Sequence, residues 1–252
     1  MVKGLDLFRE HFREYADRYV LIGGTACVLA MGQAGVEFRA TKDLDIVLCV
    51  EALDREFVAA FWSFVRSGGY QVQEKSTGRK QFYRFQKPED DSFPFMLELF
   101  ARVPDALQIA EGSHLTPLPM EEEISSLSAI LLDAGYYGFI LAGRREWEGL
   151  PFIGAEHLIP LKARAWLDLM ERQGSEEAID SKAIKKHKND VFRLYQIVDP
   201  DAMPAAPENV KNDLRLFIAR MAAEEVDLKA LGMRGVSRDD VLVSLSSLYG
   251  LG

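Results

Sequence analysis

The stretch that decides the fold runs from Tyr19 to Leu48 and reads YVLIGGTACVLAMGQAGVEFRATKDLDIVL. Its first four residues are an apolar run with the length and composition of a buried strand, and Gly23-Gly24-Thr25 ends that run sharply. A helical segment follows from Ala26 to Ala34, and a second strand begins at Asp43. The pattern therefore predicts a strand, a glycine turn, a helix and a second strand in succession.

Two acidic residues, Asp43 and Asp45, open the second strand. Because strand side chains alternate between faces, both carboxylates share one face, whereas Leu44 and Ile46 take the other. Two adjacent carboxylates repel each other unless a cation lies between them, and Mg²⁺ is the simplest hard cation with oxygen ligands. The alternative is a solvated acidic strand start, but the strand continues into a core-like run, where an unneutralised acid pair is unfavourable.

A third acid, Glu98, stands alone in the apolar strand sequence Met96-Leu97-Glu98-Leu99-Phe100. Burying it without a partner would cost on the order of several kcal/mol, so it needs a cation or a metal ion. The alternative is an edge-strand residue that faces water. Beside the other two acids, a metal-binding role is favoured.

The turn Gly23-Gly24-Thr25 places backbone N–H groups at the start of a helix, where they suit an anion. Glycine there lets a triphosphate approach the main chain without a Cβ in the way. Most Gly-Gly pairs between a strand and a helix only relieve backbone strain, so the turn indicates phosphate binding only in combination with the acids that follow.

Together, this glycine turn and the Asp-x-Asp strand resemble the nucleotidyltransferase superfamily, and within it the AbiEii-type abortive-infection toxins. The resemblance implies two Mg²⁺ ions and an NTP substrate: one ion would bind the NTP phosphates and the other would activate the attacking hydroxyl. The implied metal ligands are Asp43, Asp45 and Glu98. The chain departs from the simplest family pattern by a wide spacing between turn and acids, with an added loop at 32–35.

Further residues are assigned by the resemblance to substrate binding or catalysis. Lys162, in the sequence Pro160-Leu161-Lys162-Ala163, resembles a family lysine that helps to hold the nucleotide phosphates. Lys188 and Asp190 resemble the last family motif, a basic residue shortly before an aspartate on a helix. In a functional interpretation, Lys188 would contact phosphates of the NTP or of an acceptor RNA, and Asp190 would orient Lys162 or the ribose. The alternatives are a snorkelling lysine for Lys162 and a solvated helix face for the other two. The residues assigned to substrate binding are Gly23, Gly24, Thr25, Lys42, Lys188 and Asp190.

A net charge of −9 excludes a globally basic nucleic-acid-binding protein. One local basic strip is interpreted as a charged hairpin edge that blocks edge pairing, rather than as an RNA contact. Its members are Lys75, Arg79, Lys80, Arg84 and Lys87.

Periodicity predicts the remaining elements. The expected helices are Leu5–Asp17, Leu53–Ser67, Ala155–Arg172, Ser181–Val198, Val210–Ala223 and Asp239–Tyr249. The expected strands are Tyr70–Gln73, Gln81–Gln86, Phe95–Phe100, Ser126–Leu132 and Leu150–Ile153, with Tyr136–Gly143 open between helix and strand.

The predicted fold class is α/β, a nucleotidyltransferase-like mixed sheet with flanking helices and a helical C-terminal half. The expected domains are 1–154 and 155–252, packed on each other. The chain lacks an apolar run long enough to span a membrane, has no signal-peptide pattern, and has two cysteines in apolar runs, so we expect a cytoplasmic protein without membrane contact.

The expected activity is transfer of a nucleoside monophosphate from an NTP to a hydroxyl or phosphate acceptor. The resemblance implies tRNA as an acceptor and a toxin role with an antitoxin partner. Two alternatives stay open: a small-molecule nucleotidyltransferase of the antibiotic-modifying kind, and a nucleotide- or partner-binding module without activity.

Overall fold

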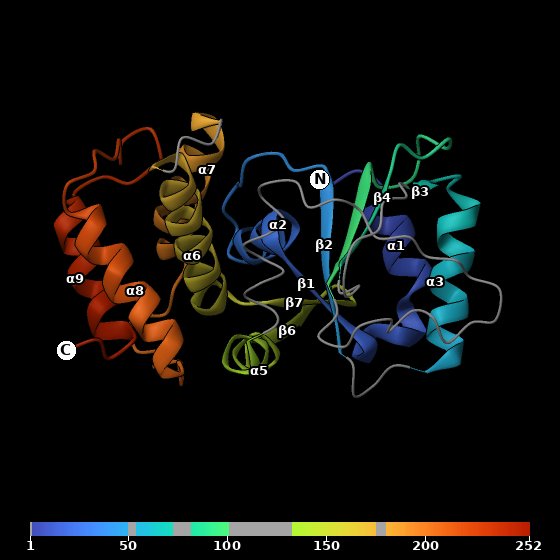
Figure 1. Ribbon diagram of the computed structural model, residues 1–252, viewed down its shortest axis with the longest axis horizontal. Helices are drawn as coiled ribbons and strands as arrows, with labels where there is room; N and C mark the ends of the chain where they lie inside the picture. Colours follow the sequence, from blue (N-terminus) through green and yellow to red (C-terminus); the bar gives the residue numbers. More distant parts are fainter. Residues whose placement is uncertain (1, 50–53, 73–81, 101–132, 175–179) are drawn as a thin grey trace. The chain divides into compact units, whose positions relative to one another are not determined.

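The computed structural model describes residues 2–49, 54–72, 82–100, 133–174 and 180–252 (Figure 1). They fall into two compact units, one made of the described residues within 1–121 and 144–153, the other of those within 122–143 and 154–252. The predicted division between residues 154 and 155 stays a prediction. In the structure, helix α5 (Ala134–Ala142) groups with the helices that follow Gly154.

A mixed sheet dominates the first unit, and its seven described strands run in the order β3-β4-β5-β2-β1-β7-β6. The strands are β1 (Tyr19–Ile22), β2 (Asp43–Leu48), β3 (Gln71–Val72), β4 (Phe82–Gln86), β5 (Met96–Phe100), β6 (Arg144–Trp147) and β7 (Leu150–Ile153). The prediction of a mixed α/β sheet with flanking helices is confirmed.

The centre of the sheet is β1, β2 and β5. β1 pairs antiparallel with β2, and β2 pairs parallel with β5. The parallel register sets Asp45 beside Glu98 and Asp43 beside Met96. Two acids from distant parts of the sequence therefore meet on neighbouring strands.

Helices cover both faces of this sheet. The helices of the first unit are α1 (Leu5–His11), α2 (Gly23–Gln33) and α3 (Arg55–Ser67). Figure 1 shows α2 on one side of the sheet and α1 with α3 on the other. On the α1 and α3 side, fully buried aromatic rings pack together, among them Phe8 against Phe64 at 5.6 Å and Phe12 against Phe64 at 5.4 Å between ring centroids. This cluster forms much of the core that holds the sheet.

The predicted N-terminal helix, Leu5–Asp17, is wrong in its length. The chain leaves the α-helix at Phe12 (φ −102°, ψ 14°) and continues as a 3₁₀ helix, η1 (Arg13–Arg18), which is kinked at Tyr15. Phe12 is completely buried among aromatic rings of α3 and β1. The break lets Phe12 enter that cluster while the chain turns toward β1.

One strand, β6, was not predicted. It pairs with β7 through a two-residue turn in which Glu148 and Gly149 both have positive φ, 53° and 77°. Such turns match the twist of a hairpin, and their usual sequence signal is Asn-Gly or Asp-Gly. Glu-Gly lacks that signal, so the hairpin is hard to see in the sequence.

The second unit is helical in its described part. Its helices are α5 (Ala134–Ala142), α6 (Ala155–Gly174), α7 (Ser181–Tyr195), α8 (Glu208–Met221) and α9 (Arg238–Leu248). Trp166 of α6 packs edge-on against Phe217 of α8, and the Tyr249 hydroxyl after α9 donates to the Glu156 carbonyl oxygen at 2.7 Å. These contacts join α8 and α9 to α6.

The predicted strand Ser126–Leu132 lies outside the described residues, and residues 136–143, left open above, fall mostly within α5. None of the described helices is both long and apolar enough to cross a bilayer.

Candidate functional site

The start of α2 depends on glycine because two other segments approach its backbone closely. Gly23 has a positive φ of +62°, and a Cβ there would collide with the Asp45 carboxylate. A Cβ on Gly24 would lie 2.6 Å from Thr41 Oγ1. The diglycine pair therefore both turns the chain out of β1 and makes room for β2.

Hydrogen bonds fasten the start of α2 to the start of β2. The Gly24 N–H donates to Asp45 Oδ2 at 3.3 Å, and the Thr25 hydroxyl donates to the Asp43 carbonyl oxygen at 2.7 Å. Backbone N–H groups at a helix start carry partial positive charge, so they favour a carboxylate or a phosphate. Here the Asp45 carboxylate accepts a hydrogen bond from one such group, the Gly24 N–H.

Asp45 and Glu98 form the centre of the site. Glu98 is 8% exposed, and its carboxyl group hydrogen bonds with Asp45. Burial and the adjacent Asp45 carboxylate raise the pKa of Glu98 well above its ordinary value, although the Arg84 guanidinium opposes the shift.

Arg84 belongs to this site, which corrects its interpretation as part of a charged hairpin edge. Strand β4 lies between β3 and β5, and Arg84 stands opposite Glu98 in the antiparallel register. Its Nε and one terminal nitrogen contact Glu98 Oε1 at 2.8 Å and 2.6 Å. A sequence signal did exist: a lone acid in an apolar strand needs a cation, and the preceding strand carries Arg84.

The third acid, Asp43, shares the face of Asp45 by strand alternation and is half-buried. Among the residues that the structure describes, no three His, Cys, Asp or Glu side chains lie close enough together to hold a metal ion. The fold thus brings Asp45 and Glu98 together, whereas Asp43 lies two residues earlier on β2, opposite Met96.

The donor set still fits one divalent cation. Carboxylate oxygens are the ligands that Mg²⁺ prefers, and the like-charge pair of Asp45 and Glu98 gains from a cation between them. When all three acids are ionised and Arg84 is paired to Glu98, these four side chains together carry two net negative charges. That charge matches a single Mg²⁺, and the two ions of the sequence prediction stay a prediction.

Lys42, which precedes the acids, is exposed. Its ammonium lies 5.8 Å from the ring centroid of Phe95, which precedes β5. The contact is a cation–π interaction at the start of the two parallel strands. Substrate binding by Lys42 stays a prediction.

In the second unit, Lys162 and Asp190 are brought together although 28 positions separate them in the sequence. Lys162 Nζ lies 3.4 Å from Asp190 Oδ2, and the side chains are 6% and 0% exposed. Arg193 also contacts Asp190, at 3.4 Å. Burial excludes the snorkelling alternative for Lys162, because a snorkelling lysine keeps its ammonium in water.

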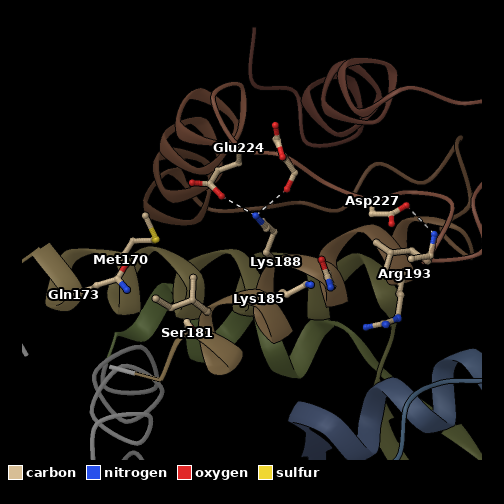
Figure 2. A pocket seen from close by; sticks show the side chains of 13 residues that line it. Met170, Gln173, Ser181, Lys185, Lys188, Arg193, Glu224 and Asp227 are labelled. Carbon is tan, nitrogen blue, oxygen red and sulfur yellow. Dashed lines mark hydrogen bonds and ion pairs between the residues drawn. The ribbon is translucent and has the colours of Figure 1, made fainter. Parts of the chain in front are cut away.

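Lys188 does not join that pair. Its ammonium contacts Glu224 Oε2 at 2.7 Å and the Glu225 carbonyl oxygen at 3.0 Å (Figure 2). It lines a half-open pocket of about 610 Å³ within the second unit. Substrate binding by Lys188 and Asp190 stays a prediction; the structure gives both residues protein partners.

Comparison with known proteins gives little beyond this geometry. No family model matches the chain, and no curated protein matches it. One similar solved structure is an antigenic nucleotidyltransferase-like protein from Paracoccidioides brasiliensis, with 16% identity, a TM-score of 0.48, and coverage of 91% of this chain and 93% of that chain. A likeness at this level carries no functional argument.

The first prediction concerns Gly23. Gly23→Ala is expected to lower the free energy of unfolding by about 2 kcal/mol or more, because positive φ and a collision with Asp45 both disfavour the Cβ. Gly35→Ala is the matched control: Gly35 has a φ of +71° with no neighbour within 4 Å. Urea unfolding measures both, and equal losses would contradict the close approach of Asp45.

The second prediction concerns pH. Because the pKa of folded Glu98 is raised, the folding free energy that Glu98 contributes is present below its unfolded pKa and is lost as pH rises through its folded pKa. Asp45→Asn removes the adjacent like charge, so in EDTA it is expected to be about 1 kcal/mol more stable than wild type at about pH 8. This advantage should shrink as the pH is lowered toward about 5.

Thermal unfolding across that pH range measures the effect. Asp91→Asn is the control, since Asp91 is a fully exposed acid paired with Lys3. A stability difference between Asp45→Asn and wild type that does not change with pH would contradict the coupling of the two acids.

The third prediction concerns Lys162. Lys162→Met is expected to lower the free energy of unfolding by about 2 kcal/mol, because fully buried Asp190 loses one cationic partner while Arg193 remains in contact with it. The double variant with Asp190→Asn should recover part of that loss. Guanidinium chloride unfolding of the three variants measures the coupling, and a loss below about 0.5 kcal/mol for Lys162→Met would exclude a structural role.

Proposed function

We propose that this chain is a Mg²⁺-dependent nucleotidyltransferase. One observation carries the proposal: Asp45 receives the Gly24 N–H at the start of α2 and lies beside buried Glu98 on the neighbouring parallel strand. A helix start suited to phosphate and a carboxylate pair suited to a divalent cation therefore meet at one residue.

In the proposed reaction, the acceptor oxygen attacks the α-phosphorus of an NTP, the bond from that phosphorus to the bridging oxygen breaks, and pyrophosphate leaves. The start of α2 binds phosphate oxygens. The acceptor proton passes to a carboxylate, Glu98 or Asp45. A bound Mg²⁺ supplies stabilisation of the negative charge on the phosphates.

The acceptor is proposed to be a hydroxyl or phosphate group. The resemblance to AbiEii-type toxins supports tRNA as that acceptor, and with it the role of a toxin that an antitoxin partner inhibits. The net charge of −9 favours the alternative, a small-molecule acceptor.

A second candidate function is a nucleotide-binding module without transfer. It is favoured by Arg84, which already neutralises Glu98, and by the absence of a three-residue metal cluster among the described residues. Such a protein would bind NTP at the start of α2 and release it unchanged.

The fourth prediction separates these functions. Incubation with each α-labelled NTP, Mg²⁺, and either total tRNA or added small acceptors is expected to place label on an acceptor. Asp43→Ala/Asp45→Ala should reduce transfer by about a thousandfold or more, because it removes two of the three acids. Asp91→Asn, an exposed acid, is the matched control and should transfer at the wild-type rate.

Label on tRNA supports the first acceptor, and label on small acceptors alone supports the second. NTP binding without label transfer would refute the transferase and support the nucleotide-binding module. Equal transfer by wild type and by Asp43→Ala/Asp45→Ala would place the chemistry elsewhere in the chain.

A further inference from the structure

Glu98 is held from both neighbouring strands. Arg84 on β4 lies opposite it in one register, and Asp45 on β2 lies beside it in the other. The side chains of Arg84 and Glu98 are 10% and 11% exposed, so their ion pair is largely removed from water. Charge-assisted hydrogen bonds in such surroundings fix the orientation of a carboxylate strongly.

The two arginine contacts reach a single oxygen of Glu98. Nε and a terminal nitrogen of Arg84 both contact Oε1, at 2.8 Å and 2.6 Å. Two adjacent nitrogens of Arg84 thus hold Oε1 of Glu98, which fixes the orientation of the carboxyl group that also hydrogen bonds with Asp45.

We infer that Arg84 is a positioning residue that sets both the orientation of Glu98 and the charge of the carboxylate site. The inference rests on the proposed function. When all three acids are ionised they carry three negative charges, and Arg84, which is paired with Glu98, reduces the total to two. A site with that charge becomes neutral with one divalent cation bound, so it does not repel the triphosphate of an incoming NTP.

Two substitutions separate charge from orientation. Arg84→Gln removes the charge, so Mn²⁺ is expected to bind about tenfold more tightly, while the KM for NTP rises about tenfold because the site keeps excess negative charge. Arg84→Lys keeps the charge but loses the fork. It should bind Mn²⁺ within about twofold of wild type and show a kcat about tenfold lower.

The measurements are Mn²⁺ titration followed by electron paramagnetic resonance, steady-state kinetics with NTP, and circular dichroism as a check on folding. Arg18→Gln is the matched control, because it removes another ion pair of the first unit, Arg18 to Asp54 at 2.7 Å, and should leave the Mn²⁺ affinity unchanged. A merely structural arginine would weaken Mn²⁺ binding when replaced. Unchanged or weaker Mn²⁺ binding by folded Arg84→Gln would therefore overturn the inference.

The Mn²⁺ titration needs no turnover, so the two proposals can fail separately. Tighter Mn²⁺ binding by Arg84→Gln in a protein that transfers no nucleotide would refute the transferase and keep the charge-setting role of Arg84. Transfer by wild type with an unchanged Mn²⁺ affinity in Arg84→Gln would refute that role alone. A wild-type protein that binds no Mn²⁺ would refute both.

Discussion

The contact between the carboxyl groups of Asp45 and Glu98 is the constraint on which the site depends. Two acids on neighbouring parallel strands repel each other, and Glu98 is also removed from water. The protein compensates with the Gly24 N–H on Asp45 and the Arg84 guanidinium on Glu98. Each of these groups comes from a different element, so the first unit must be folded before the two acids can lie side by side.

The diglycine pair and the Asp-x-Asp strand act as one structural unit. Gly23 must lack a Cβ because Asp45 occupies that space, and Gly24 must lack one because Thr41 approaches it. The close approach is what lets a helix N-terminal N–H reach an acidic side chain. A phosphate bound near Asp45 would contact the N–H groups at the start of α2, and a cation bound there would contact the Asp45 carboxylate. This arrangement is the physical basis of the proposed transferase.

The second unit uses its charges differently. Lys162 and Asp190 neutralise each other in the interior, whereas Lys188, two residues before Asp190, lies on the wall of a pocket and contacts Glu224. Residues two apart on a helix point in different directions, so the motif at 188–190 divides into a buried part and a pocket-lining part. Removing one member of this buried pair alone is expected to destabilise the helical unit, because the other charge would lose a partner.

The sequence by itself determined the local elements and the identity of the acids. Apolar runs and period-two alternation place β1, β2 and β5 and put Asp43 and Asp45 on one face, because these signals come from neighbouring residues. Helical periodicity likewise locates α3, α6 and α7 to within a few residues at their ends. The break at Phe12 and the hairpin at Glu148-Gly149 were missed, since packing and backbone twist decide them.

Only the tertiary structure decided which charges meet. The pairing of Arg84 with Glu98 follows from a strand register, that of Lys162 with Asp190 follows from the packing of two helices, and the need for glycine at Gly23 follows from the position of Asp45. Each depends on residues far apart in the chain, and local pattern carries no information on their distance. The sequence identifies the charged groups, and the tertiary structure determines which of them form pairs.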